Sequence, residues 1–224
     1  MHLRDLVQFL AELSENNNRA WFVMNKPRYD ILRAEFLDLV TGLIGDLKRL
    51  DPAVAACNPK KALFRINRDM RFSHDKSPYK THFSASITAS GLKKPSQGGG
   101  PAYYFHIDAE GTLLVAGGEY MPPPDRLRAI RQRIVADPAG FSKLLKNRKL
   151  LATFGSLQEE GKLVRPPKGF EPDSPHVEYL KLKSFIVWKE TSLRKKLPAD
   201  LQKDLATTFK DAWPLIDWLR QVPR

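Results

Sequence analysis

The sequence predicts an α+β fold, with a mainly antiparallel sheet of about four to six strands packed against N- and C-terminal helices. Apolar residues recur at helical spacing through residues 1–50 and again through 198–220. Residues 60–120 instead contain consecutive strand-like runs, and strands joined by short turns pair antiparallel. We expect one domain over residues 1–224, with helices at 1–50, the sheet and a basic loop at 60–120, and helices with a closing strand and helix at 124–222.

The first fifty residues predict three helices. Leucines follow helical spacing from Leu3 to Leu13, and three asparagines at 16–18 interrupt the pattern. A second helix is expected near Arg19. A third should begin near Pro27, because proline suits the first turn of a helix, and should run to about Leu50. The Asp-Pro pair that follows ends it.

The middle of the chain predicts the sheet. The four expected strands are 62–66, 83–90, 102–108 and 112–118. Residues 109–111 end in glycine and should form a hairpin turn. Residues 91–101 are rich in glycine and predict a loop inserted between strands.

The second half predicts helices around one late strand. We expect a helix at 126–136 capped by Asp125, a helix at 141–146, a strand at 184–189 and a closing helix at 198–220. Large aromatic residues, Trp188 among them, are expected to pack in the core.

Composition excludes several classes of protein. No apolar run approaches the roughly 18 residues that a membrane helix needs, and the N-terminus lacks the apolar core of a signal peptide, so we expect cytoplasmic residence and no membrane partner. Cys57 is the single cysteine, which excludes an internal disulfide framework and a multi-cysteine metal site. We expect no cofactor and no metal. The glycines at 98–100 lack the lysine and the serine or threonine of a phosphate-binding P-loop.

The basic charge is concentrated in one part of the chain. The net charge is +12, and residues 51–100, with nine basic and three acidic side chains, carry half of it. A basic surface attracts anions and nucleic acid.

Within that block, residues 65–82 combine cations with hydrogen-bond donors at high density. Guanidinium groups match phosphate and carboxylate groups geometrically. We therefore predict that this basic loop binds an anionic ligand. The expected ligand-binding residues are Arg65, Asn67, Arg68, Arg71, Lys76, Tyr79 and Lys80.

Three other interpretations of these residues stay open. Asp69 and Asp75 could pair with the arginines in a purely structural network. His106 or His82 could act as the acid or base of an enzyme with an anionic substrate, with the arginines holding the substrate. Tyr104, His106 and Asp108 alternate and should line one strand face. The loop could instead dock an acidic protein partner.

Several motifs occur together in a fixed order. They are Asn16–Phe22, Phe64–Phe72, Asp75–Thr81, Tyr104–Ile107 and Pro167–Phe170. In this combination the chain resembles a bacterial and fungal family, domain-of-unknown-function family 2461, over nearly its whole length. The resemblance implies no activity, because the family carries none. The best hypothesis from the sequence is binding of a phosphate-bearing or other anionic ligand, either a nucleotide or a nucleic acid. The sequence does not indicate a reaction or an oligomeric state.

Overall fold

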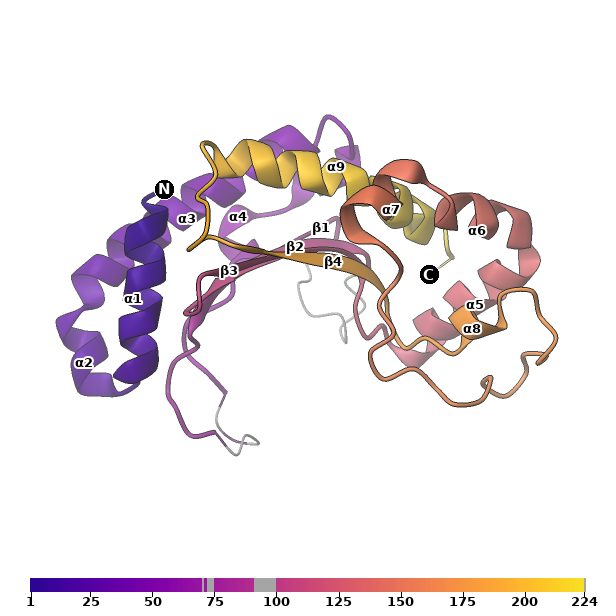
Figure 1. Cartoon of the computed structure of the whole chain (residues 1–224), viewed down its shortest axis with the longest axis horizontal. Coiled ribbons are helices and arrows are strands. Elements are labelled where there is room, and N and C mark those ends of the chain that lie inside the picture. The colour runs from indigo at the N-terminus through magenta and orange to yellow at the C-terminus, as the bar shows by residue number, and fades with distance from the viewer. Residues whose placement is uncertain (70, 72–74, 91–99, 224) are drawn as a thin grey trace.

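A computed structural model describes residues 1–69, 71, 75–90 and 100–223 (Figure 1). The loop expected at 91–101 therefore lies almost wholly outside the described residues, as does part of the basic loop. The helices are α1 (Leu3–Glu15), α2 (Arg19–Met24), α3 (Lys26–Leu47), a 3-10 turn η1 (Pro52–Ala56), α4 (Pro59–Ala62), α5 (Pro124–Ala136), α6 (Pro138–Leu145), α7 (Arg148–Phe154), α8 (Val177–Leu180) and α9 (Leu201–Arg220). The strands are β1 (His82–Thr88), β2 (Ala102–Asp108), β3 (Thr112–Glu119) and β4 (Phe185–Ser192).

The described strands form one antiparallel sheet in the order β1-β2-β3-β4, which confirms the predicted α+β class. The turn between β2 and β3 lies where the sequence predicts it. Gly111 has φ +75° there, and Asp108 accepts hydrogen bonds from the amides of Gly111 and Thr112. Glycine adopts this left-handed backbone without steric cost.

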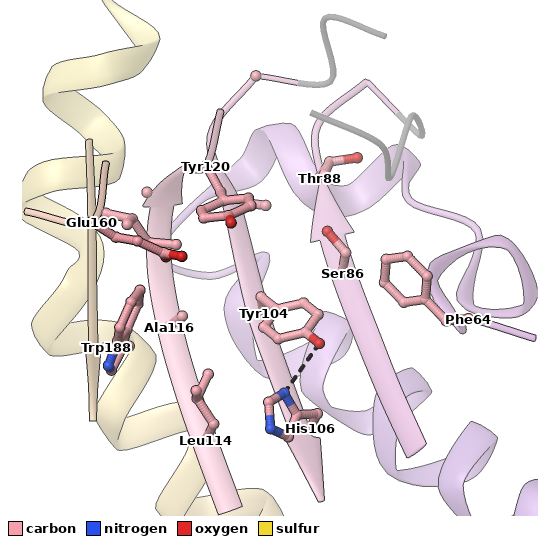
Figure 2. A pocket seen from close by; sticks show the side chains of 14 residues that line it. Phe64, Ser86, Thr88, Tyr104, His106, Leu114, Ala116, Tyr120, Glu160 and Trp188 are labelled. Carbon is pink, nitrogen blue, oxygen red and sulfur yellow. Dashed lines mark hydrogen bonds between the residues drawn. The ribbon is translucent and has the colours of Figure 1, made fainter. Parts of the chain in front are cut away.

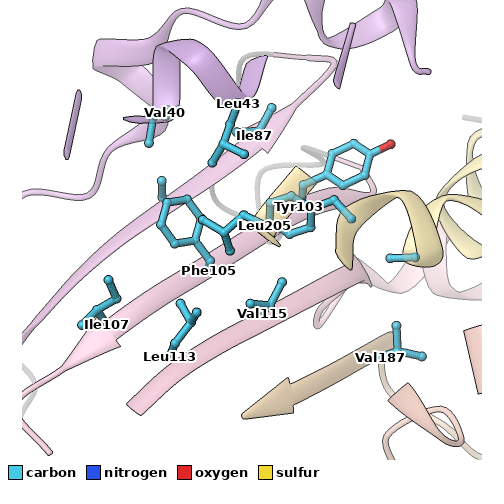
Figure 3. Packing of buried hydrophobic residues seen from close by; sticks show 14 of the residues in the cluster. Val40, Leu43, Ile87, Tyr103, Phe105, Ile107, Leu113, Val115, Val187 and Leu205 are labelled. Carbon is cyan, nitrogen blue, oxygen red and sulfur yellow. The ribbon is translucent and has the colours of Figure 1, made fainter. Parts of the chain in front are cut away.

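Helices cover one face of the sheet. In Figure 3 Val40 and Leu43 of α3 and Leu205 of α9 lie against alternate residues of the strands, such as Phe105 and Val115. Phe105 is fully buried, with its ring centroid 5.2 Å from that of Phe36. Among the described residues no helix covers the other face in this way: in Figure 1 the sheet arches below α3 and α9, with its concave side turned away from them. Alternation of side chains along a strand makes the two faces chemically different.

A buried polar cluster joins α9 to the sheet. The Tyr103 hydroxyl donates to Asp51 Oδ2 at 3.0 Å, and the Arg220 guanidinium pairs with the same carboxylate. Asp51 is 1% exposed. A buried carboxylate needs such partners, so this cluster fixes the C-terminal end of α9 against β2 and the end of α3.

Two local predictions were wrong. Residues 62–66 are not a strand: α4 occupies the start of this segment, because Asn58 caps it by accepting from the amides of Lys60 and Lys61. The segment pairs with β1 through an isolated bridge between Leu63 and Ala85, and the Phe64 amide donates to the Ser84 carbonyl at 3.0 Å.

Asp125 does not cap a helix. The helix α5 begins one residue earlier at Pro124, and Asp125 lies in its first turn. Proline fixes the backbone angle that a first helical turn requires. Within the described ranges, no helix has the length and apolar character to cross a membrane.

Candidate functional site

The concave face of the sheet carries a cavity of about 400 Å³. Its floor comes from all four strands and its rim from the segments beside them. Figure 2 shows Tyr104 and His106 between Phe64 on the β1 side and Trp188 on the β4 side. Glu160 and Tyr120 also line the cavity. Aromatic rings and small side chains such as Ala116 make most of the wall apolar, as is usual for small-molecule sites.

The strand register assembles this floor in rows. One row runs across the sheet through Ser86, Tyr104, Ala116 and Trp188. The adjacent row runs through Ser84, His106, Leu114 and Glu190. Each row takes one residue from each strand, and these residues alternate with those that face α3 and α9. The cavity is therefore a direct product of the pairing.

Two polar groups in the cavity are hydrogen-bonded to each other. The Tyr104 hydroxyl lies 3.1 Å from His106 Nδ1. Burial raises the pKa of Tyr104 and lowers the pKa of His106, although the charges of Asp108 and Glu190 partly oppose the latter shift. At neutral pH both groups are uncharged, and the His106 imidazole can exchange protons.

A second histidine lies at the basic end of the cavity. The His82 ring centroid is 5.5 Å from that of His106. Burial lowers the pKa of His82 to about 4, and the positive charges of Lys80 and Arg68, together with that of His106 when it is protonated, act in the same direction, whereas Asp108 opposes them. Charges of the basic segment therefore act on His82, which lies beside the cavity residue His106.

The basic segment begins as a paired stem, which we define as residues 65–68 with 77–80. The two sides pair antiparallel at Asn67 and Tyr79, supported by hydrogen bonds from the amides of Arg68 and Lys80. Asn17 holds the stem against the N-terminal helices, since its side chain donates to the Tyr79 carbonyl and accepts from the Tyr79 amide. This pairing fixes the conformation of the backbone that carries the cationic side chains of the stem.

The two carboxylates of the segment engage two of its arginines. Arg68 pairs with Asp75, and Arg71 Nη2 donates to Asp69 Oδ2 at 2.7 Å. Hydrogen bonds from Arg71 hold the pKa of Asp69 well below its usual range. The pKa of Asp75 falls to about 2, first through hydrogen bonds from Ser77 and then through Arg68. These pairs are the network that the structural interpretation expects, but they lie at the surface, where ion pairs add little stability.

The remaining predicted site residues differ in accessibility. Arg65, Asn67 and Lys76 are exposed. Tyr79 is buried and stacks on Phe22, with ring centroids 4.0 Å apart, so it has a packing role. Lys80 connects the stem with the cavity, because its ammonium lies 5.5 Å from the ring centroid of the cavity residue Phe64. It also donates to the Arg65 carbonyl at 3.0 Å.

The sequence of the chain agrees with one known family over most of its length. The sequence profile of a family described as conserved hypothetical protein (DUF2461) matches residues 5–218. The chain belongs to this family. No curated protein and no solved structure matches it.

Within the part of the chain that matches DUF2461, Phe64 lines the cavity and is followed by the stem. The description of the family names no activity, so function must be argued from the cavity itself. Among the described residues, no three histidine, cysteine, aspartate or glutamate side chains come together as a metal site would require.

Sequence reasoning missed several cavity residues. Trp188 was assigned to the core, yet it lines the cavity. Side chains alternate along β4, with Phe185 and Val187 on one face and Ile186 and Trp188 on the other. Because both sets are apolar, the alternation does not indicate which face is packed in the core. The sequence offers no signal for Glu160, because it belongs to the connection between α7 and α8, and only the folded chain brings this connection to the rim of the cavity.

Proposed function

We propose that this protein binds a small organic anion, with the flat apolar part of the ligand in the cavity and the anionic group facing the stem. The observation that carries the proposal is the contact between the two regions, where the Lys80 ammonium lies over the Phe64 ring that forms the cavity wall. Aromatic carboxylates, aromatic sulfonates and nucleotides all combine a flat ring with an anionic group.

The apolar part of the ligand is inferred from the walls. The cavity wall presents the aromatic rings of Phe64, Tyr104 and Trp188. Ala116 lies between Tyr104 and Trp188 in the strand register, and its small side chain leaves space above the sheet. Phe64 and Tyr104 meet edge to face at 6.1 Å between centroids. Stacking on such rings contributes about 1–3 kcal/mol for each base or comparable ring. A volume of about 400 Å³ suits a ligand of one or two rings.

The anionic group is inferred from the field at the β1 end. Lys80 and Arg68 both oppose protonation of His82, which supports a positive field at this end. At the opposite side of the floor, Glu190 and the rim residue Glu160 are acidic. A ligand with one anionic end should therefore bind in one orientation, with that end toward the stem.

Two dyes of matched shape test the proposal. Anilinonaphthalene sulfonate has a flat aromatic body and one anionic group, and N-phenylnaphthylamine has the same body without the charge. We expect the sulfonate to bind more tightly, by roughly tenfold at low salt, and the difference to shrink as salt screens the charge. Fluorescence titration measures both affinities. Equal affinity for the two dyes would contradict the anionic part of the proposal.

Three variants locate the binding. Trp188→Ala should weaken both dyes, because it removes a wall of the cavity. Lys80→Gln should weaken only the sulfonate. The control is Lys143→Gln on α6, which removes an exposed charge far from the cavity. If Trp188→Ala leaves both affinities unchanged while circular dichroism shows an intact fold, the dyes bind elsewhere and the cavity assignment fails.

A second candidate function is proton transfer to or from the bound anion. The hydrogen bond of 3.1 Å between the Tyr104 hydroxyl and His106 Nδ1 favours it, because the bond fixes the imidazole in the cavity wall. In this reaction His106 would take a proton from an acidic carbon of the ligand and return it.

Phenylpyruvate tests this second function, since it joins an aromatic ring and a carboxylate to an acidic methylene group. Nuclear magnetic resonance in deuterium oxide follows the replacement of its methylene protons by deuterium. We expect the protein to accelerate the exchange and His106→Gln to abolish the acceleration while binding remains. Unchanged exchange with bound phenylpyruvate would exclude this chemistry at His106.

A further inference from the structure

The outer edge of β4 has backbone groups that no described part of the chain pairs. The Leu193 amide points inward and donates to the Gly111 carbonyl, whereas the Ile186 carbonyl points outward and accepts from Gln158. Because these directions alternate along a strand, the amides and carbonyls of Trp188 and Glu190 also point outward. Glu190 and the following Thr191 are exposed. This part of the edge can therefore accept another strand.

A basic groove lies beside the same edge. It is formed by α1 and the connection from β4 to α9, and its volume is about 600 Å³. Val7, Ala11 and Leu193 give it an apolar floor. A second hollow of about 430 Å³ shares Leu193 and Lys196 with the first and continues between β4 and α9. The cations along the two hollows are Arg4, Lys189, Arg194, Lys195, Lys196 and Lys203.

These cations lack carboxylate partners within the described chain, although Arg194 Nη2 donates to the Ala109 carbonyl at 3.0 Å. Among the described residues, none of the six forms an ion pair with a carboxylate, in contrast to Arg28 on the neighbouring helix, which binds both Asp5 and Glu12. Asp204 is the one acidic residue that lines the two hollows in the described chain. Glu190 lies on the edge itself, but its side chain belongs to the concave face, opposite to Lys189.

We propose that this edge and groove dock an extended acidic segment of another protein. The segment adds a strand outside Trp188 and Glu190, and its acidic side chains face Lys189, Lys196 and Arg194. This surface is separate from the stem and does not depend on the function of the cavity.

Two physical arguments favour a peptide over other occupants. Only a polypeptide offers alternating amides and carbonyls that match those of the β4 edge, so nucleic acid would use the charge alone. A second copy of this chain pairing through the same edge would bring two basic grooves together, and like charges oppose that contact. Lysine beside an edge strand discourages neutral or basic partners, which leaves acidic ones.

The experiment uses the full chain and a fluorescein-labelled decapeptide of alternating glutamate and threonine. Fluorescence anisotropy measures its affinity at low and at physiological salt. A peptide with glutamine in place of glutamate tests the charge. Two further peptides, N-methylated at all glutamates or at all threonines, each block one edge of the extended peptide.

We expect the acidic peptide to bind and the glutamine peptide to bind at least about tenfold more weakly. At least one N-methylated peptide should lose affinity by a similar factor of roughly ten, because it has lost its amides toward β4. Lys189→Glu with Lys196→Glu should weaken the acidic peptide, and the matched exposed substitution Lys143→Glu should not.

Several results would overturn the proposal. They are no binding of the acidic peptide at low salt, equal binding of both N-methylated peptides and the parent, or no effect of the double charge reversal. Tighter binding of a ten-nucleotide single-stranded DNA, weakened by the same reversal, would instead assign the groove to nucleic acid. Sedimentation that shows a dimer broken by the reversal would assign the edge to a second copy.

Discussion

Tyr103 and Tyr104 are neighbours on β2 but belong to different environments. Tyr103 is fully buried under α9, where it donates to Asp51 and its ring lies 5.3 Å from that of Phe209. Tyr104 lies on the concave face, where its hydroxyl meets His106 in the cavity wall. The same contrast holds along the whole sheet. One face is filled by the protein's own helices, and the other keeps a cavity.

The difference teaches which residues can be assigned to folding and which to function. On the helix-covered face the buried side chains, such as Tyr103 and Phe105, are already packed under α3 and α9, so substitutions of them should act on stability. On the concave face the aromatic and hydroxyl groups line an open volume, so substitutions should act on ligands. The predictions that follow test this division.

The largest effect is expected at Phe105. Phe105→Ala should lower the free energy of unfolding by about 3–5 kcal/mol, because it removes a fully buried ring between α3 and α9. Urea denaturation measures this. The control is Ser86→Ala on the concave face, where the loss should stay below about 1 kcal/mol. Similar losses for both variants would show that the two faces do not differ as described.

A smaller effect is expected at Gly117, where the sheet and α9 approach closely. A Cβ atom at this position would lie 2.6 Å from the Cβ of Ala212. Gly117→Ala should therefore cost about 1–3 kcal/mol, since α9 must shift. The next residue toward the N-terminus, Ala116, faces the cavity, and Ala116→Ser should cost less than about 1 kcal/mol. Thermal unfolding of the pair gives the comparison, and a stable Gly117→Ala protein would argue against close packing here.

The two tyrosines provide the next test. Tyr103→Phe leaves the buried Asp51 carboxylate with one donor fewer and should cost about 1–3 kcal/mol. Tyr104→Phe should cost less than about 1 kcal/mol, because water in the open cavity can replace its hydroxyl. The latter variant should instead alter ligand affinity in the dye titration. A larger stability loss for Tyr104→Phe than for Tyr103→Phe would reverse the assignment.

The smallest effect on stability at neutral pH is expected for His82, and this effect increases as the pH falls. Its pKa is lowered from 6.5 to about 4 in the folded protein, chiefly by burial. Between these two values the unfolded chain binds a proton that the folded protein does not, so stability falls as the pH decreases through this window. Below about 4 both states are protonated and the penalty becomes constant.

His82→Gln should remove this part of the pH dependence. Urea midpoints measured from pH 7 to pH 4 should fall less steeply in the variant than in the wild type. His106, whose pKa burial also lowers, should contribute with the same sign. Parallel curves for wild type and His82→Gln would show that His82 is not protected from protonation in the fold.

Much of the fold could be predicted from local patterns. The helices at the N-terminus, the hairpin at Gly111 and the strands β1, β2 and β3 each follow from spacing that acts within a few residues. The failure at residues 62–66 has a local cause as well. The Asn58 cap and Pro59 favour a helical turn, and this preference outweighed the apolar pattern of Leu63 and Ile66.

The sequence by itself determined the α+β class, the antiparallel pairing and the shared strand face of Tyr104 and His106, because strand periodicity depends only on neighbouring residues. It also determined that the basic residues gather in one segment. The sequence left open whether Asp69 and Asp75 engage the arginines of the segment, which they do. Only the tertiary structure decided that Tyr79 is buried on Phe22, and that Trp188 and Glu160 join the cavity. Those contacts join residues whose separation along the chain carries no signal, and they arise from the packing of whole elements against the sheet.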